Sequence, residues 1–155
     1  MSSICVGYFK IKKNRKLCIE SLTDFARYNG FGILFDNEVH SEEFLAPYRN
    51  QSCYVVFSIV DNFEFDTCHK IFWSDLCRDP EQISLKENIT MIVKLIEIML
   101  QYTNIVDLFW GSWGCFETEY LKQYVSPQEL FNLWEYYINN DIIQPYRHFI
   151  VENQN

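Results

Sequence analysis

Three segments with strand character follow one another between residues 31 and 66 with no predicted helix between them. Residues 31–35 form a short apolar run, residues 53–60 form an almost continuous one, and residues 63–66 alternate phenylalanine with carboxylate side chains. A polar stretch at 36–50 is predicted as a loop. Parallel neighbours need a crossover of a dozen or more residues, usually a helix, whereas antiparallel neighbours need only a turn. The spacing therefore favours an antiparallel sheet over a doubly wound parallel one.

Two helices are predicted from capping boxes, in which a serine hydroxyl accepts from a backbone amide three residues on. The serines are Ser84, followed by Glu87, and Ser126, followed by Pro127 and Glu129. Apolar side chains recur at helical spacing behind both, at Leu85, Ile89, Ile92, Val93, Ile96, Met99 and Leu100 and at Leu130, Trp134, Tyr137 and Ile138. A third amphipathic helix covers 18–26, and Asn29-Gly30 is predicted to end it through a left-handed cap.

Further strands are predicted at 4–11, 105–110 and 144–151, while 71–77 is predicted as a strand or a short helix. The sequence contains no Pro-, Gly- or Ser-rich linker and no internal repeat, so residues 1–155 are predicted to form a single domain. Strands and helices are mixed without strict alternation. We therefore expect an α+β single-domain sandwich of about three helices packed on a mainly antiparallel sheet.

The formal net charge of −8 argues against nucleic acid and anionic membranes as partners, because both require Lys and Arg to displace counterions. The longest apolar stretch, 89–100, is interrupted by Thr90, Lys94 and Glu97 and is too polar to span a bilayer. At the N-terminus an apolar run precedes the cationic one, the reverse of a secretory signal, which favours a cytoplasmic location. The six cysteines are accordingly predicted to be free and mostly buried.

Motifs for catalysis or metal binding are weak. Cys68-His69 with Cys77 comes nearest to a metal cluster, but neighbouring strand residues point to opposite faces, so no metal or cofactor is expected. Cys115 follows a Gly-Ser-Trp-Gly turn, and His148 is a candidate base for its thiol. The turn is more simply explained as a strand end, and no catalytic residue is assigned. The alternative remains a small cysteine-containing enzyme or ligand-binding domain with its site near Trp110, Trp113 and Cys115.

Charge is distributed unevenly along the chain. Residues 1–35 carry a net charge of +4, whereas residues 36–81 carry ten acidic and three basic side chains, a net −7, with aromatic residues among them. Aromatic side chains supply contact area in protein interfaces, and carboxylates steer a basic partner toward its site. The predicted partner contacts are therefore taken from this segment: Glu42, Glu43, Asp61, Glu64, Asp66, Trp73 and Asp75.

In size, acidity, aromatic content and lack of a catalytic motif, the whole chain resembles the small acidic immunity proteins of bacterial toxin–immunity pairs, including those of contact-dependent growth inhibition. These proteins share no diagnostic motif, so no residue role is transferred from them. The resemblance implies a cytoplasmic inhibitor, not an enzyme, that binds a cognate protein toxin with a basic surface, often a nuclease, in a one-to-one complex. The oligomeric state of the protein itself does not follow from it.

Overall fold

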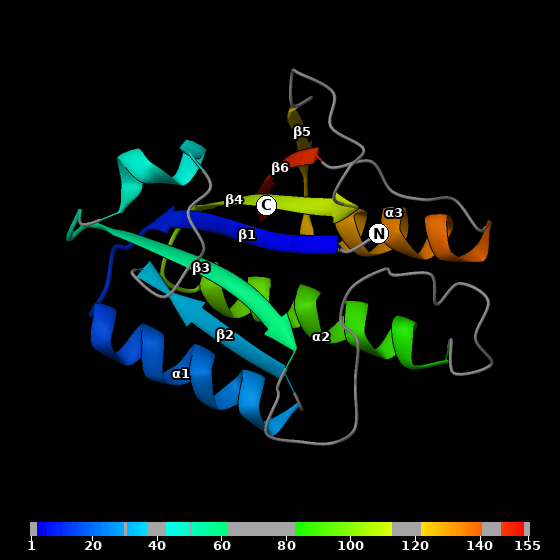
Figure 1. The fold of residues 1–155 in the computed structure, drawn as a ribbon, viewed down its shortest axis with the longest axis horizontal. Helices are drawn as coiled ribbons and strands as arrows, with labels where there is room; N and C mark the ends of the chain where they lie inside the picture. Colours follow the sequence, from blue (N-terminus) through cyan, green and yellow to red (C-terminus); the bar gives the residue numbers. More distant parts are fainter. Residues whose placement is uncertain are drawn as a thin grey trace.

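The computed structural model of the protein describes residues 3–29, 31–36, 43–49, 51–61, 83–112, 122–140 and 147–153. These residues form three α-helices, a 3-10 helix and six strands (Figure 1). The helices are α1 (Arg15–Tyr28), α2 (Ile83–Met99), α3 (Pro127–Asn139) and the 3-10 helix η2 (Glu43–Tyr48). The strands are β1 (Ser3–Lys10), β2 (Phe31–Phe35), β3 (Tyr54–Asp61), β4 (Ile105–Ser112), β5 (Lys122–Val125) and β6 (Arg147–Glu152).

All six strands belong to one sheet with the order β2-β3-β1-β4-β6-β5. Four neighbouring pairs are antiparallel, and only the edge pair β5–β6 is parallel among the described strands. The predicted α+β single-domain fold, with three helices on a mainly antiparallel sheet, is confirmed. The edge strand β5 was not predicted, because its four residues acquire strand structure through pairing with β6, more than twenty residues further along the chain.

The main core fills the space between the sheet and the helices (Figure 1). Alternate strand residues point toward the helices, as the period of two requires, and include Phe9, Phe57 and Trp110. From Ile89 onward, the apolar stripe of α2 lies inside this core, with Ile92 and Ile96 at 0% exposure. In α3, Trp134 stacks on Trp110 with ring centroids 3.7 Å apart. The core therefore joins all three helices to the central strands.

A second, smaller cluster lies on the opposite face of the sheet, beneath η2. Leu45 of η2 is completely buried there against Val6, Val56 and Phe109. The prediction of a loop throughout 36–50 is therefore wrong for residues 43–48. The helical turn forms because it buries Leu45 on the sheet, a tertiary contact that the polar composition of the segment conceals.

Helix ends match the sequence prediction in part. The Ser126 hydroxyl accepts from the Glu129 amide at 3.1 Å, as predicted for α3. The N-cap of α1 is Asn14, whose side chain accepts from the Leu17 amide at 3.3 Å. One prediction is wrong: α2 begins at Ile83, so Ser84 lies within its first turn. Asn29 is the C-cap of α1, and its side-chain amide donates to the Phe25 carbonyl at 2.8 Å. Gly30, the residue that would adopt the predicted left-handed conformation, lies outside the described residues.

The predicted segments 63–66 and 71–77 lie outside the described residues, as does the start of the predicted strand 144–151. The latter is observed as β6, from Arg147 to Glu152. No helix among the described residues is long and apolar enough to cross a membrane.

Candidate functional site

Of the seven predicted partner contacts, the structure describes the backbone of two. Glu43 begins η2, and Asp61 ends β3 opposite Phe31 of β2. Glu42, Glu64, Asp66, Trp73 and Asp75 lie outside the described residues. Asp61 is at the far end of β3 from Tyr54, the residue whose ring contacts η2.

The alternative site near Trp110, Trp113 and Cys115 is described only at Trp110. Its indole is fully buried and stacked on Trp134, which is a core position. Trp113 and Cys115 lie outside the described residues. His148, the candidate base, bonds to Asp107 with 2.7 Å between its Nε2 and the carboxylate Oδ1.

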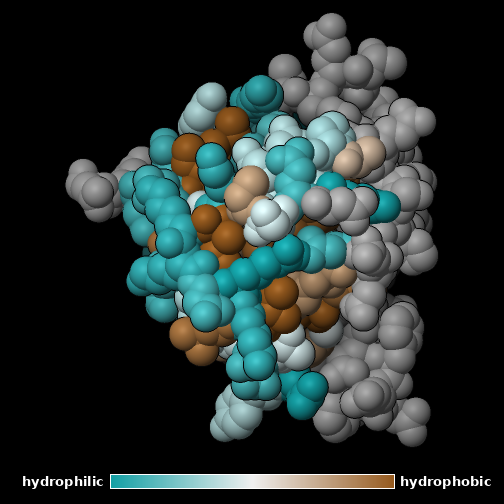
Figure 2. All heavy atoms as spheres, turned by 90° about the vertical axis from the view of Figure 1, so that its left-hand side faces the viewer, coloured by the Kyte–Doolittle hydropathy of each residue, from teal (hydrophilic) through white to brown (hydrophobic). Residues whose placement is uncertain are grey.

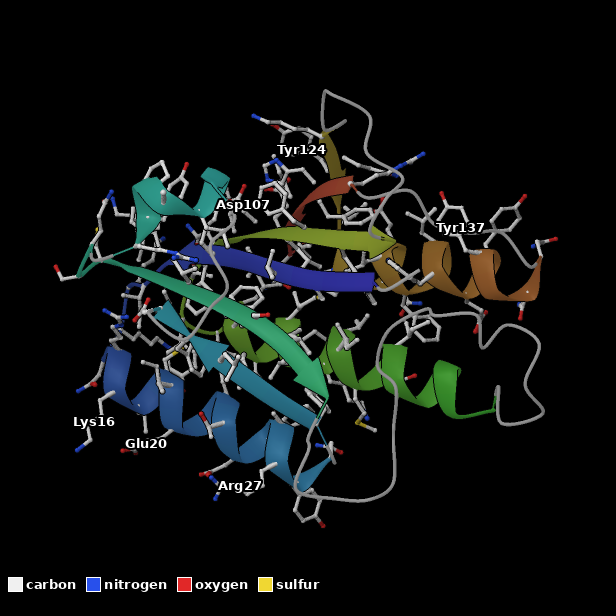
Figure 3. All side chains as sticks on the ribbon, in the orientation of Figure 1. Lys16, Glu20, Arg27, Asp107, Tyr124 and Tyr137 are labelled. Carbon is white, nitrogen blue, oxygen red and sulfur yellow. The ribbon has the colours of Figure 1, made fainter. Side chains whose placement is uncertain are left out.

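The face of the sheet opposite the helices carries polar and aromatic side chains. Asp107 of β4 and Tyr124 of β5 both lie on this face (Figure 3). The Asp107–His148 contact connects neighbouring strands β4 and β6, and the imidazole also stacks on Phe109 at a centroid distance of 4.2 Å. With His148 only 6% exposed, this contact fixes the imidazole against the sheet.

Three tyrosines meet beside Asp107. Tyr8 of β1 stacks on Tyr48 of η2, with ring centroids 3.7 Å apart and planes 14° from parallel. Tyr54 of β3 meets the Tyr48 ring edge-on at 5.0 Å. Burial raises the pKa of the Tyr8 hydroxyl well above its usual value, and its hydrogen bond to Tyr48 and the nearby Asp107 carboxylate raise it further. Tyr8 is therefore a neutral hydroxyl that holds η2 on the sheet.

An open pocket of about 400 Å³ lies beside this tyrosine cluster. It is located where β1 ends and β3 and β4 begin, at the left of Figure 1. From that side, a band of hydrophilic side chains crosses exposed hydrophobic atoms (Figure 2). The pocket is lined by Tyr8, Lys10, Lys12, Tyr48, Tyr54, Thr103, Asn104, Ile105 and Asp107.

Local structure explains how these side chains converge. Tyr8 and Lys10 are two residues apart on β1 and share a face, and Lys10 is paired with Tyr54 in the register. Beyond the strand, the Lys12 amide donates to the Tyr102 carbonyl at 2.9 Å, which holds Lys12 beside the turn between α2 and β4. The Thr103 hydroxyl donates to the Ile105 carbonyl at 3.2 Å and orders that turn. The cationic run is visible in the sequence, but the other residues that line the pocket are not, because only strand register brings them beside the lysines.

Burial disfavours the reactive thiolate form at two of the described cysteines. Burial raises the pKa of the Cys5 thiol, and it raises the pKa of Cys18 to about 11 against a lowering by the Arg15 charge. Both are buried free thiols, as predicted, while Cys53 is half-buried. Within the described ranges, no three His, Cys, Asp or Glu side chains are grouped to hold a metal ion.

We expect iodoacetamide at pH 8 to alkylate Cys5 and Cys18 of the folded protein at least about tenfold more slowly than Cys53, because thiolate is the reactive form and access is blocked. Peptide mass spectrometry over time measures the rates. Equal alkylation rates of these thiols in denaturant are the control, and equal rates in the folded protein would contradict the burial. Preferential alkylation of Cys115 would support the alternative site.

The raised pKa of Cys18 also means that the stability of the folded protein falls as pH rises toward 11, since the unfolded chain releases that proton first.

Compared with known proteins, the chain matches no family, and no curated protein or solved structure is significantly similar to it.

Proposed function

We propose that this protein is a cytoplasmic immunity protein that binds a cognate protein toxin with a basic surface and neutralises it in a one-to-one complex. The observation that carries the proposal is the uneven distribution of charge along the chain. The segment 36–81 has a net charge of −7, and the chain as a whole −8. Carboxylates concentrated in one segment attract a basic protein and raise its association rate.

The sheet register separates Asp61 of the acidic segment from Lys10, whereas Asp36 of the same segment forms an ion pair with Arg15. Lys10 at the end of β1 is paired with Tyr54 at the start of β3, whereas Asp61 is seven residues further along β3. At about 3.3 Å per residue, this distance is roughly 23 Å. Because the Debye length is about 8 Å at physiological ionic strength, Lys10 has little influence on a basic partner that contacts Asp61.

Aromatic side chains at the surface are consistent with a protein partner. Tyr124 on β5 is 66% exposed and Tyr136 on α3 is 56% exposed. Tyrosine is enriched in the residues that dominate binding energy at interfaces. These side chains supply contact area in addition to the electrostatic attraction.

Reversal of charge in the acidic segment tests the proposal. We expect Glu64→Lys with Asp66→Lys to weaken partner binding by about 2–5 kcal/mol, as for charge pairs buried at an interface. The partner is first obtained by co-purification from the native host, and its affinity is measured by surface plasmon resonance over a range of salt concentrations. The association rate of the unmodified protein should fall steeply with salt.

The matched control is Glu20→Lys, an exposed carboxylate on the outer side of α1 and outside the acidic segment (Figure 3). It should leave the affinity nearly unchanged. The proposal also requires that the purified partner be toxic and lose its toxicity at equimolar inhibitor. A harmless partner, or an affinity unaffected by the double reversal, would contradict it.

A further inference from the structure

The pocket beside the tyrosine cluster has more basic than acidic side chains in its lining, whereas the chain as a whole is acidic. Lys10, Lys12, Lys13, Arg15 and Lys16 place five cations within seven residues of a chain with net charge −8. Arg15 forms an ion pair with Asp36. The four lysines have no carboxylate partner within salt-bridge distance among the described residues, and two of them, Lys10 and Lys12, line the pocket.

The pocket offers three kinds of contact at once. Lys10 and Lys12 are exposed ammonium groups that bind phosphate or carboxylate. The half-buried Tyr54 ring and the 41%-exposed Ile105 supply an aromatic and an aliphatic surface for a planar group. The Asp107 carboxylate, which bonds to His148 through Oδ1, has further acceptor capacity for a ligand N–H or O–H.

We propose that this pocket binds a free nucleoside monophosphate, with its phosphate at Lys10 and Lys12, its base against Tyr54, and a donor group directed to Asp107. A volume of about 400 Å³ is within the range of small-molecule sites. One ligand of this class satisfies the cations, the aromatic wall and the acceptor together. A simple anion satisfies the lysines alone.

The charge of the molecule favours a mononucleotide over a nucleic acid strand. The cationic run is short, and the chain around it carries 21 acidic side chains against 13 basic ones in total. A strand longer than the cationic run would bring further phosphates to a molecule of net charge −8, where no counterion release compensates for the repulsion. The lysines repel a basic protein, and the test of the pocket uses no protein partner, so it does not depend on the proposed toxin contact.

Isothermal titration of the full chain with AMP, CMP, adenosine and inorganic phosphate tests the proposal. We expect at least one nucleotide to bind tenfold or more tightly than both adenosine and phosphate. Lys10→Gln and Lys12→Gln should each weaken nucleotide binding about fivefold, the effect of one exposed charge contact. Lys16→Gln is the matched control, because this lysine belongs to the same cationic run but lies on α1 outside the pocket (Figure 3).

A second variant separates the base contact from the phosphate contact. Tyr54→Leu should weaken nucleotide binding but leave the affinity for inorganic phosphate unchanged, with near-UV circular dichroism confirming that the fold is retained. Nucleotide binding no tighter than that of phosphate, or an equal loss in Lys16→Gln, would overturn the proposal. A decamer of thymidylate that binds more tightly than every mononucleotide would also overturn it, by assigning the site to single-stranded nucleic acid.

Discussion

Trp134→Ala should destabilise the protein by about 3–5 kcal/mol, the usual cost of removing a large aromatic side chain from a core. Trp134 is 1% exposed, and its ring stacks on the fully buried Trp110 at 3.7 Å and 20°. The substitution leaves a cavity between α3 and β4 and removes the stacking partner of Trp110. Urea unfolding followed by far-UV circular dichroism measures the change in free energy without relying on tryptophan fluorescence.

A second variant at Trp134 separates the contribution of the aromatic ring from that of the indole N–H group. Among the residues that the structure describes, neither Trp110 Nε1 nor Trp134 Nε1 has a hydrogen-bond partner, although both atoms are buried. Trp134→Phe removes one of these donors while keeping an aromatic ring, so it should cost less than half as much as Trp134→Ala. Tyr136→Ala on the same helix is the control, because a 56%-exposed side chain should change stability by no more than about 0.5 kcal/mol. A cost below 1 kcal/mol for Trp134→Ala would show that the stacked pair does not support the core.

Gly7→Ala should destabilise the protein by about 3 kcal/mol or more, at the upper end of the range for overpacked cores. A Cβ at this position would lie 2.1 Å from the Asp107 carbonyl oxygen of β4 and 2.9 Å from Cζ of Phe57. Gly7 is in β1, which is hydrogen-bonded to β3 on one side and β4 on the other. Neither neighbour can move away without breaking a central ladder. Chemical denaturation of the purified variant measures the loss.

A double-mutant cycle shows whether the Asp107 carbonyl or the Phe57 ring excludes a Cβ at position 7. Phe57→Leu shortens the side chain that faces Gly7 but leaves the Asp107 carbonyl in place. We therefore expect Gly7→Ala to cost nearly the same in the Phe57→Leu background, with a coupling energy below about 1 kcal/mol. Full recovery of stability in the double variant would show that the ring, and not the backbone of β4, excludes the methyl group.

Sequence periodicity predicted the helical layer well because the signals are local. Ile89, Ile92 and Ile96 recur on one face of α2 and are all buried. Ser126 caps α3 through a hydrogen bond that spans three residues. The strands 31–35 and 105–110 were found for the same reason, since an apolar run is visible without any knowledge of its neighbours.

The candidate site could not be predicted in the same way. The lysines of the pocket were noted as a charge run, but Tyr48, Tyr54 and Asp107 come from η2, β3 and β4 and converge only through packing and register. The acidic contacts chosen for the toxin partner rest on charge alone, and the structure describes only Glu43 and Asp61 of them, as backbone positions. They remain predictions.

The sequence by itself determined an acidic α+β chain with three amphipathic helices, closely spaced strands and a cationic run near its start. Spacing and composition are sufficient for these features, because each depends on residues a few positions apart. Tertiary structure decided the strand order, the parallel edge strand β5, the turn of η2 over the sheet and the pocket of tyrosines and lysines. These depend on contacts between residues tens of positions apart, where burial and register outweigh local preference.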